Sequence, residues 1–207
     1  MRKSLLLIPA IALFFGCSSK HHLTRTGETP LEIHNQIYNA VKDGNLDNAD
    51  NYLLDLEASY PGSIYIKDDL LILFKAHLEH KEYQLAKFYL SQYEKRFATP
   101  DEIPWCEYQK IKVDFLSYTN AYTNEDALLN IIQECKTYKT QYPDSNYIYE
   151  VNTIYMKALL TKQYLDDKIY KLYKKEGKEK AAEKYKTSIP ENSKPPVIPW
   201  YKKLFYW

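Results

Sequence analysis

Hydrophobic side chains recur along the central part of the chain at the spacing of one face of a helix. Two such segments lie on either side of a polar interval that contains Gly44. Because an α-helix has 3.6 residues per turn, each segment would bury one side against the other. Gly44 lets the chain turn, and Pro61 ends the second segment. Residues 30–63 are therefore predicted to form a helical hairpin, with its buried face built from Ile33, Ile37, Ala40, Val41, Leu53 and Leu56.

The hairpin has the length and the small residues of a tetratricopeptide (TPR) repeat. Residues 30–63 make a block of 34 residues, with Gly44, Ala49 and Pro61 at the turn, close-packing and helix-ending positions. In later units Ala86 and Ala127 are expected to play the role of Ala49. The helices predicted for these units span residues 70–80 and 83–97 in the second, and 103–118 and 125–142 in the third.

The remaining pattern predicts a looser fourth unit. Residues 147–163 and 165–176 are expected to form two helices, and a last helix follows Gly177 and ends near Pro190. We therefore expect an all-α, TPR-like helical-hairpin solenoid of about nine helices over residues 31–190. Stacked hairpins of this kind bury their hydrophobic faces only against their neighbours.

The first residues have the pattern of a secretory signal. Arg2 and Lys3 precede an apolar run over residues 5–15, which as a helix would span about 16 Å, roughly half a bilayer core. The run is therefore too short to cross a membrane. Gly16 followed by Cys17 is typical of the lipobox of bacterial lipoproteins. We expect a signal peptide over residues 1–16 and lipidation of Cys17, whereas an ordinary secretory signal with an incidental cysteine is the alternative.

Two further segments flank the predicted solenoid. Residues 17–30 are polar and lack periodicity, so they are expected to join the lipidated cysteine to the helices as a flexible tether. Residues 191–207 form a tail rich in proline and aromatic residues. Its prolines exclude a regular long helix. The tail is expected either to fold back as a cap on the last helix or to serve as a docking peptide.

Composition and charge narrow the function classes. The 207 residues include only 5 glycines, and the formal net charge is +1. Acidic residues outnumber basic ones over residues 31–156, whereas basic residues predominate from residue 157 onward. An acidic body repels phosphate, which argues against nucleic-acid binding. The basic end either meets an acidic partner or is a solvated lysine-rich helix.

The search for catalytic or metal-binding chemistry gives little. The chain has no glycine-rich phosphate loop and no motif for a nucleophilic serine or cysteine. His77 and His80 share a helix face, but no third metal ligand has motif spacing, so no metal and no cofactor is expected. Cys106 and Cys135 lie on predicted neighbouring helices and form either a disulfide or two buried free thiols. The sequence does not indicate an enzyme.

Solenoids of this kind commonly bind extended peptides on the face formed by the first helix of each repeat. Repeat position places seven residues on that face, each of which is otherwise an ordinary surface residue. The peptide-groove candidates are His34, Tyr38, Lys42, Asp68, Leu71, Lys75 and Glu79.

Three features together resemble the BamD (ComL) family, the TPR lipoproteins of the outer-membrane β-barrel assembly machinery. They are the lipobox, the recurring Tyr-Pro-x-Ser turns at residues 60–63 and 142–145, and the late segment over residues 164–185. The resemblance covers about residues 13–190. The chain departs from the family pattern where a full fifth repeat would lie.

The resemblance implies a non-catalytic scaffold, lipid-anchored to the outer membrane and facing the periplasm. Its amino-terminal repeats would bind unfolded outer-membrane protein precursors. Its carboxy-terminal repeats would bind the barrel-forming partner, BamA, beside other assembly-machinery lipoproteins. The competing hypothesis is another lipidated TPR adaptor, such as a pilus or secretin pilotin.

Overall fold

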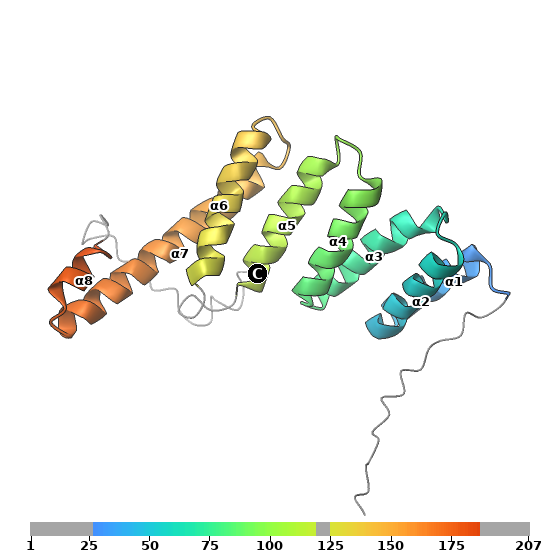
Figure 1. Cartoon of the computed structure of the whole chain (residues 1–207), viewed down its shortest axis with the longest axis horizontal. Helices are drawn as coiled ribbons and strands as arrows, with labels where there is room; N and C mark the ends of the chain where they lie inside the picture. The colour runs from blue at the N-terminus through green and yellow to red at the C-terminus, as the bar shows by residue number, and fades with distance from the viewer. Residues whose placement is uncertain (1–26, 119–124, 187–207) are drawn as a thin grey trace, which may run out of the picture.

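A computed structural model describes residues 27–118 and 125–186, which form eight helices and no strand. The helices follow one another as antiparallel neighbours in an elongated array (Figure 1). Their bounds are α1 (Pro30–Lys42), α2 (Leu46–Ser59), α3 (Tyr65–Glu79), α4 (Tyr83–Phe97), α5 (Ile103–Ser117), α6 (Glu125–Gln141), α7 (Ile148–Lys175) and α8 (Glu179–Glu183). The predicted all-α fold of TPR-like hairpins is confirmed.

Local sequence signals begin and end the first hairpin as expected. Thr29 caps α1 in a capping box: its hydroxyl accepts from the backbone N–H of Glu32, whose carboxylate accepts the backbone N–H of Thr29 at 2.7 Å. Pro30 occupies the first turn, where no backbone N–H is needed. Gly44 adopts φ +73°, a left-handed conformation that glycine takes without a steric cost.

The Tyr-Pro-x-Ser motif builds the same turn twice. The hydroxyls of Ser63 and Ser145 accept the backbone N–H two residues later, from Tyr65 and Tyr147. Each serine carbonyl then accepts the N–H that starts the next helix, from Ile66 or Ile148. The motif therefore ends one helix and orients the next, which explains why it recurs at equivalent junctions.

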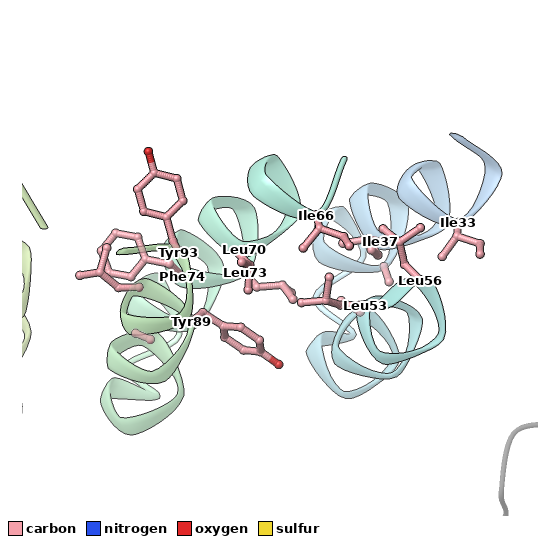
Figure 2. Packing of buried hydrophobic residues seen from close by; sticks show 14 of the residues in the cluster. Ile33, Ile37, Leu53, Leu56, Ile66, Leu70, Leu73, Phe74, Tyr89 and Tyr93 are labelled. Atoms are coloured by element: carbon pink, nitrogen blue, oxygen red, sulfur yellow. The ribbon is translucent and has the colours of Figure 1, made fainter. Parts of the chain in front are cut away.

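Two clusters of buried side chains form the core. The first joins α1 to α5, and Figure 2 shows side chains of the first hairpin meeting those of α3 and α4. The second joins α5, α6 and α7. Helix α5 contributes to both, because Cys106 and Val113 lie in the first cluster and Ile111 in the second. The array is thus continuous, but its two halves share only this helix.

The two helices expected over residues 147–176 are one helix in the structure, α7, which has 28 residues. Residues 163–165 contain no glycine or proline to break it. Ion pairs one turn apart support the continuous helix: Lys162 with Asp166 spans the expected break, and Lys171 with Asp167 lies just after it. The final helix, α8, has five residues and ends at Glu183, well before Pro190.

Ala127 differs from the other two alanines of the repeat pattern. Ala49 and Ala86 are fully buried, whereas Ala127 is only partly buried, in the first turn of α6. Ala49 and Ala86 are the fourth residues of α2 and α4, and the fourth residue of α6 is Leu128, which is fully buried. Leu128, and not Ala127, therefore takes the place of Ala49 in the third unit.

Several predicted segments lie outside the described residues. These are the signal peptide over residues 1–16, Cys17 with most of the tether, and the tail over residues 191–207. Within residues 27–118 and 125–186, no helix is both long enough and apolar enough to span a membrane.

Helix α2 offers a matched test of the first core cluster. Leu56 is fully buried, whereas Leu54, two residues away, is 62% exposed. Replacing a buried leucine with alanine removes packing and leaves a cavity, so Leu56→Ala is expected to lower the free energy of unfolding by about 2–5 kcal/mol. Urea unfolding of the purified protein measures the change. Leu54→Ala should cost less than about 1 kcal/mol, and equal losses in the two variants would contradict the packing described above.

Candidate functional site

The seven peptide-groove candidates lie on α1 and α3, which contact each other. Tyr38 is 56% exposed, and Lys42 projects from the last turn of the same helix. On α3 the exposed candidates are Asp68, Lys75 and Glu79, whereas Leu71 is half-buried against the first core cluster. The structure thus gathers these side chains on adjacent helices, and their role in binding stays a prediction.

His34 differs from the other candidates because it is held by its neighbours. A hydrogen bond of 2.6 Å joins its Nδ1 to Oδ1 of Asp69, across from α1 to α3. Its ring also stacks on Tyr65 at the start of α3, with 4.8 Å between ring centroids. His34 therefore connects the first two repeats, and its side chain is only 21% exposed.

Asp69 is a carboxylate inside the apolar stripe of α3, with no exposed surface. Burial raises the pKa of its carboxyl group to about 6, while the hydrogen bond and charge of His34 act in the opposite direction. Its second oxygen, Oδ2, is buried with no hydrogen-bond partner among the described residues. The α1–α3 interface is consequently sensitive to the protonation of this group.

His77 is a buried residue that joins three helices. Its Nδ1 lies 2.5 Å from Oε2 of Glu82, and its Nε2 lies 2.9 Å from Oδ1 of Asp50. Its ring stacks on Tyr89 and is almost fully buried. Because both ring nitrogens are engaged, His77 joins α3 to α2 and to the start of α4. His80 is exposed, and no group of three metal-ligating side chains occurs within the described part of the chain.

The two internal cysteines are free and buried in the structure. Cys106 on α5 packs in the first core cluster, whereas Cys135 on α6 packs in the second. Burial raises the pKa of the Cys106 thiol to about 12 and that of the Cys135 thiol to about 11. Thiols of this kind are mostly unreactive near neutral pH. Of the two open alternatives, the structure contains the free thiols.

Sequence reasoning missed the partners that position His34. Asp69 follows the helical spacing of buried residues in α3, between Ile66 and Leu73. A carboxylate on the apolar side of a helix indicates a buried polar contact, and this signal could have identified Asp69. Tyr65 could not be found in that way, because its ring contact depends on the packing of α1 against α3.

Comparisons with known proteins indicate the family to which the chain is similar. A family model described as an outer membrane lipoprotein, YfiO, matches residues 27–191. The chain is also 29% identical over 204 residues to a protein of Helicobacter pylori (strain ATCC 700392 / 26695) named "Outer membrane protein assembly factor BamD". That similarity covers 95% of this chain and 93% of the H. pylori protein.

Asp69 generates a prediction for the pH dependence of stability. Its pKa is about 6 in the folded protein, against 3.8 for an ordinary aspartate. The folded state therefore keeps a proton that the unfolded chain has already released. The stability that this proton gives is present below about pH 4 and is lost as the pH rises through about 6. We expect the difference in unfolding free energy, wild type minus Asp69→Asn, to fall over that range.

Urea unfolding at several pH values between about 4 and 7 measures this difference. Asp68→Asn is the matched control, because Asp68 is the exposed neighbour of Asp69 on the same helix. Its difference from wild type should stay nearly constant with pH. A constant difference for Asp69→Asn as well would show that Asp69 does not titrate in this window.

Proposed function

Because the chain belongs to the YfiO family of outer membrane lipoproteins, we propose that it is a non-catalytic scaffold for the assembly of outer-membrane β-barrel proteins. In this proposal it binds unfolded barrel precursors and a BamA-type barrel protein at the periplasmic face of the outer membrane. Other lipoproteins of the assembly machinery complete the complex. No small-molecule cofactor takes part.

The observation that carries the proposal is the extent of the similarity. The family model covers the whole described helical array, from residue 27 to residue 191. The H. pylori protein that is named as an assembly factor aligns with 95% of the chain. Conserved length matters for a stacked array, because each added or lost hairpin would change which surfaces are available to partners.

The precursor is proposed to bind on α1 and α3. Tyr38, Lys42 and Lys75 are exposed there, and half-buried Leu71 adds apolar surface. A row of exposed polar and apolar side chains on neighbouring helices suits an extended segment, which needs both hydrogen bonds and shallow hydrophobic contacts. The His34–Asp69 contact supports this face, since it fixes the spacing of the two helices.

The partner is proposed to bind towards the other end of the array. The described residues beyond residue 157 are rich in lysine, and several lysines of α7 and α8 are exposed. Some of these are already paired within the chain, such as Lys171 with Asp167 and Lys174 with Glu179. The others give this end a positive surface that favours an acidic region of the barrel protein.

Photocrosslinking in intact envelopes tests the precursor-binding face. A crosslinking amino acid at Tyr38, on α1, is expected to capture unfolded barrel precursors, because their extended chains would lie across this face. The same amino acid at Tyr149 is the control, since Tyr149 is even more exposed, at 80%, but lies on α7. Mass spectrometry identifies the captured proteins. Equal capture at both positions, or capture of a secretin or pilus subunit at Tyr38, would overturn the assignment.

Co-purification with the barrel protein and depletion of the chain test the scaffold role itself. A BamA-type protein is expected to co-purify with the lipidated protein, and depletion is expected to lower the amount of folded barrels in the outer membrane. Mass spectrometry of the purified sample detects the barrel protein, and quantitative proteomics of outer-membrane fractions measures the amount of folded barrels. If barrel levels do not change on depletion while a pilus or secretin protein is lost, the chain is a different lipidated adaptor.

Lipidation of Cys17 is proposed as the membrane attachment. Two or more acyl chains hold a protein stably on a bilayer. Without acyl chains on Cys17, the helical array would lose this attachment to the membrane. Cys17→Ser is expected to abolish incorporation of labelled palmitate and to move the protein from the membrane to the soluble fraction. Cys106→Ser is the matched control and should leave both unchanged. Palmitate incorporation into Cys17→Ser would contradict this attachment site.

A further inference from the structure

A polar groove lies between α4 and α6, with α5 as its floor. In Figure 1, α5 stands between these two helices. The groove has a volume of about 250 Å³ and receives Lys87 from α4, Lys110 from α5 and Glu134 from α6. A water molecule occupies only about 30 Å³ of liquid. The groove is therefore large enough to admit a side chain from outside as well as solvent.

The groove replaces what is apolar packing in the first hairpin. Helices α1 and α5 both have a proline in the first turn, which aligns their positions. In this alignment Glu107 of α5 corresponds to Ile33, and Asp114 to Ala40. Both residues of α1 are buried in the first core cluster. The third hairpin thus carries charge at positions where the first hairpin has core side chains, and the groove is a built feature of it.

Its lysines are already committed to ion pairs. Lys110 contacts the carboxylates of Glu94 and Glu107, the latter at 2.9 Å. Lys87 contacts Asp114. Most of these side chains are largely removed from solvent, with 16% of Glu94 and 19% of Lys110 exposed. Charges removed from water are normally paired, and both ammonium groups here satisfy that rule.

Glu134 is the carboxylate of the groove that pairs with no lysine; its side chain instead hydrogen-bonds Asp114. Its Oε2 is buried and has no hydrogen-bond partner among the described residues. Burial and the neighbouring charge of Asp114 raise the pKa of Glu134 to about 7, while Lys87 partly offsets them. Glu94, Glu107 and Asp114 already outnumber the ammonium groups of Lys87 and Lys110, with which they pair. Ionisation of Glu134 adds a further negative charge to the site.

We propose that the α4–α6 groove is a binding site for a basic side chain, arginine or lysine, from an extended segment of a partner protein. The cationic group would enter beside Glu134 and Glu107, which both line the groove, and its aliphatic stem would lie against Ile111 and Tyr142. A bare metal ion suits the site less well, because no three ligating side chains of the described residues converge on one point.

The rim of the groove favours a protein segment over a small cation. Asn130, Gln133, Thr137 and Gln141 follow one edge of α6 along the groove. This row is about 16 Å long, at 1.5 Å per residue. Amide and hydroxyl groups both donate and accept hydrogen bonds, so they can pair with a peptide backbone. A partner segment would thus be held by its backbone at the rim and by its charge inside.

Peptide binding to the full lipidated protein in detergent micelles tests the proposal. The probes are fluorescein-labelled Gly-Ser peptides that carry two arginines, two lysines or two glutamates, followed by fluorescence anisotropy. The arginine and lysine peptides are expected to bind, and the glutamate peptide is not. At about pH 8, above the pKa of Glu134, Glu134→Gln should weaken binding of the arginine peptide about tenfold, since it removes the charge of this carboxylate. Glu125→Gln is the control, because Glu125 is exposed at the start of the same helix.

A second variant tests the groove without changing Glu134. Asn130→Arg places a guanidinium at the rim one turn before Glu134, so it should also abolish binding of the arginine peptide. Circular dichroism checks that each variant folds. Equal affinities for wild type and Glu134→Gln would overturn the proposal, as would binding of the glutamate peptide. If spermidine binds as tightly as the arginine peptide, the site takes small cations and not a protein segment.

The proposal does not rest on the role in barrel assembly. Depletion of the protein tests that role in cells, whereas the peptides test the groove on the purified chain. If Glu134→Gln loses peptide binding while depletion of the protein leaves barrel levels unchanged, the groove binds a partner outside barrel assembly. Normal peptide binding in every variant, together with impaired barrel assembly on depletion, would leave the scaffold role standing without this site.

Discussion

Helical hairpins cannot bury their apolar faces alone, and this constraint organises the whole molecule. Helix α1 packs against α2, but the side chains of both need α3 and α4 to complete the first core cluster. The second cluster likewise needs α5, α6 and α7 together. Each hairpin is therefore a supporting surface for the next, and the faces that have no neighbour are the ones open to partners.

Much of this architecture could be read from the sequence, because local signals and packing agree in the first half of the chain. Gly44, the Tyr-Pro-x-Ser turns and the spacing of the buried leucines and isoleucines each act over a few residues. The pattern was less informative from residue 147 onward. There the pattern predicts a break near residue 164, but no glycine or proline interrupts the helix at that point, and α7 is continuous. The ion pair between Lys162 and Asp166 stabilises the helix across the expected break.

The candidate binding surfaces could be predicted from the sequence only in part. Exposed candidates such as Tyr38 follow from helical position, but His34 is held by Asp69, a partner 35 residues away. The same holds for Glu134, whose importance comes from Lys87 and Asp114 on two other helices. A buried polar residue can be noticed in a sequence as an exception to the apolar pattern. Which group it meets depends on tertiary packing and is seen only in three dimensions.

Helix α7 has a mechanical consequence. Its buried residues lie in the part of the helix up to Leu165, against α5 and α6, whereas α8 packs on its distal end. With 28 residues it is about 42 Å long. The ten residues beyond Leu165 form an arm about 15 Å long. A tilt of about 10° at the packed part would therefore displace the distal end by about 3 Å relative to the end of the packed part. A small rearrangement around α5 would thus be amplified at the lysine-rich end of the molecule.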